Sequence, residues 1–178
     1  MEMDLAVKEK ALDMEEFNKV IKLNSRKIYH VAYSYLKNVE DAADITQETF
    51  FRAFKNLSNY CQDKPIFPWL YQITKNLCLN TLKKRNRESE KDTDFCLYPS
   101  AFLGPEEAYE REFSSNSLRK AVNALPLNFR EILVLKEFDG FCYEEISQIL
   151  EIPIGTVMSR LFYARQKLKD LLQDKEKI

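Results

Sequence analysis

The sequence predicts an all-α protein made of two small helical domains joined by a linker. Apolar residues recur at three- and four-residue steps along most of the chain, which is the spacing of a helix with one buried face. Only three glycines occur among 178 residues, and each falls where a linker, a turn or a helix start is expected. No segment alternates apolar and polar residues as a half-buried strand does. A chain of this length has room for one or two small cores.

Composition excludes several functional classes. The net charge is −1, so contact with nucleic acid has to come from local basic patches or with help from a larger partner. Four cysteines without metal-ligand spacing and a single histidine, His30, predict reduced thiols, no zinc site and no cofactor. The N-terminus does not resemble a signal peptide and no stretch is long enough to cross a bilayer. We therefore expect a cytoplasmic protein that is not itself a membrane protein.

The first predicted domain begins with an amphipathic helix over residues 14–36, which Asn38 ends. A second helix is expected over residues 40–57. Its polar face carries acidic, amide and basic side chains: Asp41, Asp44, Gln47, Glu48, Arg52 and Lys55. From the pattern alone, an ordinary solvated face is the better interpretation of this helix.

The third predicted helix covers residues 69–87 and follows a loop over residues 58–68, with prolines as helix breakers. Four aromatic residues crowd this region, as core residues or as platforms for unpaired bases: Tyr60, Phe67, Trp69 and Tyr71. A polar and basic line follows on one helix face: Gln72, Asn76, Asn80, Lys83 and Arg87, with Lys84 and Arg85 adjacent. Asparagine can hydrogen-bond to base edges, and the cations can neutralise phosphates. Alternatively, the cations interact with the dipole at the C-terminal end of the helix, which would leave the line of asparagines unexplained.

Residues 88–112 change character and are interpreted as an acidic linker. Pro99, Gly104 and Pro105 interrupt any helical periodicity there. Five residues are more apolar than a free linker needs, which suggests that part of the segment docks on something: Phe95, Leu97, Tyr98, Phe102 and Leu103.

The second predicted domain spans residues 113–172 and ends in a helix-turn-helix. Helices are expected up to Pro126 and again over residues 128–138, and Asp139-Gly140 turns the chain into the motif. Within the motif, the tight turn of residues 151–153 precedes a helix with an inward apolar stripe: Val157, Leu161, Ala164 and Leu168. Its other faces offer residues suited to bases and phosphates: Gly155, Met158, Ser159, Arg160, Phe162, Tyr163, Arg165, Gln166, Lys167 and Lys169. The alternative is a plain amphipathic hairpin with a solvated charged face.

Three motifs carry a family resemblance. The stretch EEISQILEIPIGTVMSRLFYARQKL resembles the region 4 helix-turn-helix of extracytoplasmic-function (ECF) RNA polymerase sigma factors. DAADITQETFFRAF and WLYQITKNLCLNTLKKR resemble segments of region 2 in the same family. The similar segments cover residues 14–87 and 113–172 in the order of the family, and two separate matches are far more specific than one helix-turn-helix.

The resemblance implies a sigma factor that binds core RNA polymerase and directs it to promoters. Contact with the clamp helices of the β′ subunit is implied for Asp41, Asp44, Gln47, Glu48, Phe50 and Phe51. Recognition of the minus-ten element is implied for Trp69, Gln72, Asn76, Asn80, Lys83, Lys84 and Arg87. Recognition of the minus-thirty-five element is implied for Gly155, Thr156, Met158, Ser159, Arg160, Phe162, Tyr163, Arg165 and Lys167. It further implies an anti-sigma partner, often membrane-bound, that covers the two DNA-binding surfaces.

Three positions depart from the family pattern. Asn80 stands where an aspartate is frequent, and Met158 and Tyr163 stand where basic residues are frequent. We expect apolar contact at Met158, for instance to a thymine methyl group, in place of a phosphate or guanine contact. The alternative function is a conventional dimeric helix-turn-helix regulator. The near-neutral net charge argues against this alternative, because a near-neutral protein is expected to bind duplex DNA poorly without a partner. No catalytic triad, metal cluster or phosphate loop suggests an enzyme.

Overall fold

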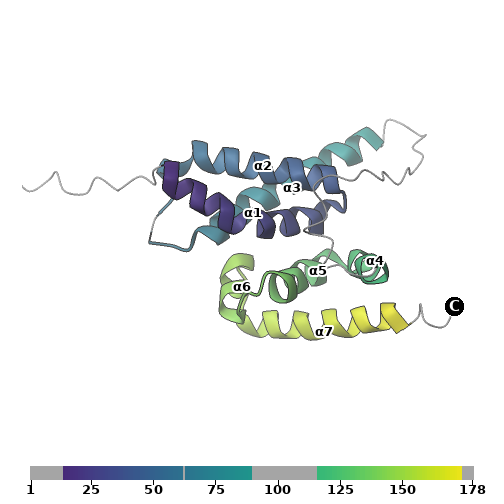
Figure 1. The fold of residues 1–178 in the computed structure, drawn as a ribbon. Helices are drawn as coiled ribbons and strands as arrows, with labels where there is room; N and C mark the ends of the chain where they lie inside the picture. Colours follow the sequence, from purple (N-terminus) through teal and green to yellow (C-terminus); the bar gives the residue numbers. More distant parts are fainter. Residues whose placement is uncertain (1–13, 62, 90–115, 174–178) are drawn as a thin grey trace, which may run out of the picture.

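The computed structural model describes residues 14–61, 63–89 and 116–173 (Figure 1). Every regular element in these ranges is helical, which confirms the predicted fold class. The N-terminal lobe contains α1 (Met14–Leu36), α2 (Val39–Lys55), the 3-10 turn η1 (Leu57–Asn59) and α3 (Ile66–Ser89). The C-terminal lobe contains α4 (Asn116–Ala124), α5 (Leu127–Leu133), the π-helical turn η3 (Val134–Phe138), α6 (Tyr143–Leu150) and α7 (Ile154–Gln173). None of the described helices is both long and apolar enough to cross a membrane.

The junction between α1 and α2 shows how the first hairpin forms. Lys37 adopts a left-handed conformation with φ 56°, which stops α1. Asn38 then acts as the N-cap of α2, because its side-chain oxygen accepts a hydrogen bond from the Asp41 amide at 3.0 Å. The predicted end of the first helix is therefore confirmed, while the asparagine belongs to the start of the next one.

Helix α3 begins earlier than the sequence indicated. The loop was expected to extend to Pro68, but the helix starts at Ile66 and places Pro68 in its first turn. Proline is tolerated there because the first N–H groups of a helix have no intrahelical acceptor. This prediction was wrong by three residues, and the difference brings Phe67 into a helix where its side chain is buried.

The helix-turn-helix forms as predicted. Glu151 ends α6 in a left-handed conformation with φ 55°, and the Ile152 amide donates to the Ser147 carbonyl at 3.1 Å. The helix expected over residues 128–138 is instead α5 followed by the π turn η3, in which the Asp139 amide bonds to the Val134 carbonyl at 3.1 Å. Gly140, with φ 74°, then reverses the chain toward α6.

The two lobes pack directly against each other. Figure 1 shows α1 and α3 of the upper lobe facing α5 and α6 of the lower lobe, and contacts join α1 with α5 and η3, and α3 with α6. Buried apolar residues of both lobes form one continuous cluster. The linker expected over residues 88–112, including its apolar docking residues, lies outside the described residues beyond Ser89, as do residues 113–115.

Candidate polymerase and promoter interfaces

Helix α2 presents the predicted polymerase-binding face to solvent. Asp44 and Gln47 are exposed and Asp41 and Glu48 are half-buried. Two of the three carboxylates on this face already have intramolecular partners: Glu48 accepts from Arg52 Nε at 2.6 Å, and Asp41 accepts from Arg85. These surface ion pairs contribute little stability, so they leave the carboxylates available for exchange with an incoming partner.

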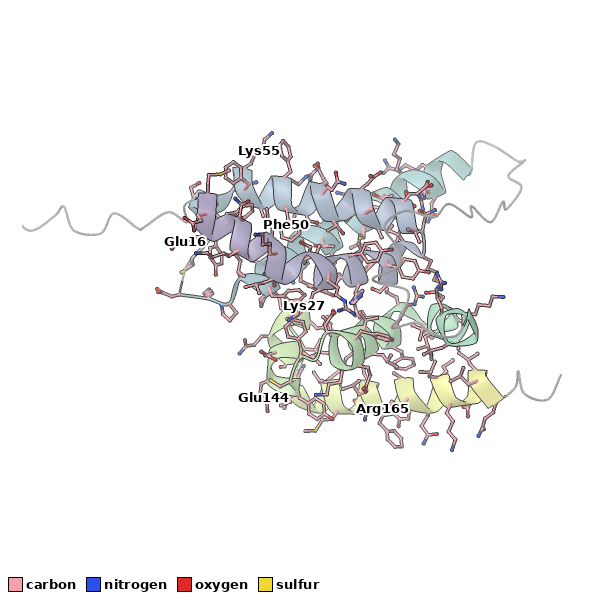
Figure 2. All side chains as sticks on the ribbon, viewed as in Figure 1. Glu16, Lys27, Phe50, Lys55, Glu144 and Arg165 are labelled. Carbon is pink, nitrogen blue, oxygen red and sulfur yellow. The ribbon has the colours of Figure 1, made fainter. Side chains whose placement is uncertain are left out.

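The two adjacent phenylalanines of α2 have opposite environments. Phe51 is 53% exposed, and the Lys55 ammonium lies 4.2 Å from the centre of its ring. Phe50 is only 6% exposed and belongs to the core of the N-terminal lobe, inside the helices in Figure 2. Neighbouring helix positions point about 100° apart, so two adjacent side chains can lie in different environments. Phe50 therefore packs inside the lobe instead of presenting its ring to a partner.

Exposed Phe54 extends this surface and was not predicted. It is 44% exposed, follows Phe51 by three positions and lies 5.4 Å from Phe17 between ring centres. The i, i+3 spacing from Phe51 was the available signal, because such residues share a helix face.

Helix α3 carries its polar line on the surface. Asn76, Asn80, Lys83, Lys84 and Arg87 are exposed, whereas Gln72 is half-buried. Gln72 Nε2 lies 3.2 Å from Glu151 Oε1 of the helix-turn-helix, so this minus-ten candidate also touches the other lobe.

The four aromatic residues around the start of α3 divide into two pairs. Tyr60 and Trp69 are half-buried and stack on each other with ring centres 5.1 Å apart and planes at 28°. Phe67 and Tyr71 are 6% and 0% exposed and serve as packing residues. Only Tyr60 and Trp69 are thus positioned to stack on an unpaired base without unfolding.

Helix α7, the second helix of the helix-turn-helix, presents an apolar and basic surface to solvent. Val157, Leu161 and Ala164 are buried and Leu168 is half-buried, as predicted. The exposed residues include the larger part of the minus-thirty-five set: Gly155, Met158, Ser159, Phe162, Tyr163, Arg165 and Lys167. Thr156 and Arg160 are half-buried. Met158, Phe162 and Tyr163 are each more than half exposed, and the two rings meet at 5.5 Å.

A half-buried carboxylate of the C-terminal lobe binds two tyrosines of the N-terminal lobe. The Tyr35 and Tyr71 hydroxyls donate to Glu131 Oε2 at 2.7 and 3.0 Å and lie 3.2 Å from each other. Burial, and then the nearby Glu131 carboxylate, raise the pKa of both phenols, so both remain protonated donors. The sequence pattern did not indicate this contact.

Further contacts cross the boundary between the lobes. His30 Nδ1 of α1 lies 2.7 Å from Asp139 Oδ1, with both side chains almost fully buried. Burial raises the pKa of Asp139, and the hydrogen bond to His30 opposes that rise. The buried Arg130 guanidinium donates to the Ser34 carbonyl of α1 and, at 2.8 Å, to the Leu125 carbonyl. Phe67 of α3 and Phe141 lie 4.6 Å apart between ring centres, with the Lys27 ammonium 4.3 Å from the Phe141 ring.

Comparison with known proteins identifies the family. Residues 20–88 match the family Sigma-70 region 2, and residues 115–168 match Sigma-70, region 4. The chain is 31% identical over 171 residues to the ECF RNA polymerase sigma factor SigW of Bacillus subtilis, covering 91% of both chains. This chain belongs to the ECF family of RNA polymerase sigma factors. It directs RNA polymerase to promoters and is not an enzyme, so the sigma-factor interpretation is confirmed over the conventional dimeric regulator.

Other comparisons agree. The ECF sigma factor SigE of Mycolicibacterium smegmatis is 35% identical over 161 residues, which cover 89% of this chain and 62% of the relative. The fold resembles the sigma factor RpoE of Bartonella quintana, solved with the anti-sigma factor NepR, with a TM-score of 0.70 and 24% identity over 90% of this chain and 98% of that one. It also resembles CnrH, solved with the cytosolic domain of CnrY, with a TM-score of 0.66 and 22% identity over 91% and 90%. Both likenesses extend over both lobes.

Proposed function

We propose that three separate helical faces of this ECF sigma factor bind polymerase, the minus-ten element and the minus-thirty-five element. The acidic and amide face of α2 docks on the clamp helices of the polymerase β′ subunit. The asparagine and cation line of α3, with Trp69, binds the minus-ten element. The outer face of α7 binds the minus-thirty-five element. Support comes from one observation: each of these faces is solvent-exposed on the helix whose motif resembles the corresponding family segment.

The α2 face is suited to a helical partner. Asp44 and Gln47 offer acceptors and donors at the surface, and Phe51 and Phe54 offer apolar area beside them. An interface of this kind combines a desolvated aromatic centre with a polar rim. Phe50 is left out of the proposed contact because it lies in the core.

The first test is capture of purified bacterial core RNA polymerase by the full chain. Gln47→Ala/Glu48→Ala is expected to reduce retention about tenfold, as loss of polar contacts at an interface centre does. Gln148→Ala removes an exposed helical glutamine from α6 and serves as the matched control. Equal retention of both variants and the wild type would remove α2 from the polymerase interface.

The exposed apolar face of α7 also supports an anti-sigma partner that keeps the sigma factor inactive in the cytoplasm. Met158, Phe162 and Tyr163 form an apolar surface on one helix, and such surfaces mark protein interaction sites. The two structural relatives were solved with a partner protein, in one case the cytosolic domain of a larger protein, which supports a membrane-bound regulator here. A photo-crosslinking residue at position 162, compared with one at 148, is expected to trap a protein that inhibits promoter transcription when added back. If the trapped protein does not inhibit, this surface serves DNA alone.

A further inference from the structure

Two cations of α2 lie against residues of its proposed polymerase-binding face. Arg52 Nε donates to Glu48 Oε1 at 2.6 Å, and the two side chains are 51% and 40% exposed. The Lys55 ammonium lies 4.2 Å from the centre of the exposed Phe51 ring. Each cation follows its partner by four positions, which is the spacing of neighbours on one helix face.

A third cation reaches the same face from α3, which packs against α2 (Figure 1). Arg85 Nη2 donates to Asp41 Oδ2, although the two residues are 44 positions apart in the chain. Arg85 follows Asn76 of the minus-ten line by nine positions, so the two side chains point about 180° apart around α3. Arg85 therefore points toward α2 and lies off the proposed minus-ten face.

We call these three cations the cation cover: Arg52, Lys55 and Arg85. Each of them contacts one residue of the proposed polymerase-binding face, respectively Glu48, Phe51 and Asp41. Two carboxylates and an aromatic ring are the groups to which a basic partner surface binds, through ion pairs and a cation–π contact. The cation cover thus occupies the acceptors that such a partner would use.

The contacts of the cation cover are weak enough to be exchanged. An ion pair between exposed side chains changes an equilibrium constant by at most about fivefold, and a cation over an exposed ring has a similar effect. A partner that uses the same acceptor first has to displace the intramolecular cation, so each contact lowers the affinity for that partner. Asp44, exposed on the same helix, adds a further carboxylate that favours a basic partner surface.

We infer that the cation cover stands in for basic residues of the polymerase surface, and that the need to displace it lowers the affinity of this sigma factor for core polymerase. This inference rests on the proposed docking of α2 on polymerase. Binding is an exchange in which cations of polymerase replace Arg52, Lys55 and Arg85. A partner without cations at matching positions gains nothing from displacing the cover, so the exchange also adds specificity.

The first experiment removes the cation cover. Arg52→Gln/Lys55→Gln/Arg85→Gln is expected to bind purified core RNA polymerase about five- to tenfold more tightly than wild type. The measurement is the Kd of the fluorescently labelled full chain in about 0.15 M salt, where distant charges are screened. Circular dichroism checks that the helices remain folded. Binding that is equal to or weaker than that of wild type overturns the inference, because it shows that the cations do not compete with polymerase or contact it directly.

A matched control removes the same charge from other faces. Lys22, Lys64 and Lys120 are exposed on α1, in the loop before α3 and on α4. Lys22→Gln/Lys64→Gln/Lys120→Gln is expected to change the Kd by less than about twofold, because screening limits the effect of charges outside the interface. Equal tightening by this control would assign the gain to net charge and would overturn the inference.

A double-mutant cycle separates exchange from repulsion. Arg52→Gln alone is expected to tighten binding about two- to fivefold. The gain should vanish in a Glu48→Gln background, because no carboxylate remains there to be exchanged. A gain that persists means that Arg52 simply repels polymerase, and it overturns the exchange.

The same cycle separates this inference from the proposed function. Unchanged binding by Glu48→Gln and by Gln47→Ala/Glu48→Ala would remove α2 from the polymerase interface, and the cation cover would lose its role with it. Weaker binding by these variants, together with no gain from Arg52→Gln, would keep α2 in the interface and would overturn only the cation cover.

Discussion

The Arg165 guanidinium of α7 forms a two-point contact with Glu137 of the π turn η3. Arg165 Nη2 lies 2.6 Å and Nε 3.0 Å from the same carboxylate oxygen. The hydrogen bond to Glu137 raises the pKa of Arg165. A predicted phosphate-binding cation of α7 is therefore already paired.

Removing the charge of Glu137 is expected to strengthen promoter binding by the holoenzyme. In wild type, Arg165 must break its ion pair with Glu137 before it can contact a phosphate. Glu137→Gln removes that ion pair, so the affinity for promoter DNA should rise at low salt. The rise should reach at most about fivefold, because an exposed ion pair contributes no more than that. Promoter binding measured against salt concentration checks this. The gain should disappear in an Arg165→Ala background, and a gain that persists there would show that Glu137 acts by general repulsion.

Met158 is expected to contact an apolar base edge. It is 51% exposed beside Phe162, and its side chain can neither donate to guanine nor pair with phosphate. Met158→Lys should change the preferred base at one minus-thirty-five position by about tenfold in a transcription screen of promoter variants. Gln148→Lys adds the same charge on the exposed face of α6. A uniform rise in affinity with no altered preference would mean that position 158 faces only the phosphate backbone.

Alanine substitutions at the neighbouring residues Phe50 and Phe51 are expected to have different effects on stability and on polymerase binding. Phe50→Ala removes a buried ring and is expected to lower the free energy of unfolding by about 3–5 kcal/mol. Phe51→Ala removes an exposed ring and should change it by about 0.5 kcal/mol or less, while weakening retention of core polymerase. Urea denaturation and polymerase capture measure the two effects. Equal destabilisation by both variants would contradict the placement of these rings.

Cys78 should make the protein sensitive to alkaline pH. Burial raises the pKa of the Cys78 thiol from 9.0 to about 12, so its stabilising contribution is fully present below pH 9 and is lost as pH rises toward 12. At pH 10.5 this loss amounts to about 2 kcal/mol relative to pH 8. Urea denaturation at both pH values should show a larger decrease for wild type than for Cys78→Ala. The difference between the two decreases isolates the thiol, because other groups titrate in both proteins.

Local sequence signals predicted what depends on neighbouring residues in the chain. The helix boundaries at Asn38, Gly140 and Glu151 were predictable because they depend on conformational preferences of residues close together in the chain. The apolar stripe of Val157, Leu161 and Ala164 identified the inner face of α7 in the same way. The position of Pro68 was misjudged, because a sequence pattern does not state how far a helix extends back through its first turn. The burial of Phe50 beside exposed Phe51 could not be read from the motif, because a motif does not state which of two adjacent residues faces inward.

The sequence by itself determined the helical fold class, the family, and the polar faces of α2, α3 and α7, because helical periodicity and motif spacing are properties of short segments. Only the tertiary structure decided that the lobes join through Glu131, Tyr35 and Tyr71, and through His30 and Asp139. These partners are separated by 60 to 109 positions in the chain. No local propensity connects residues so far apart, and their contact depends on how the two lobes pack against each other.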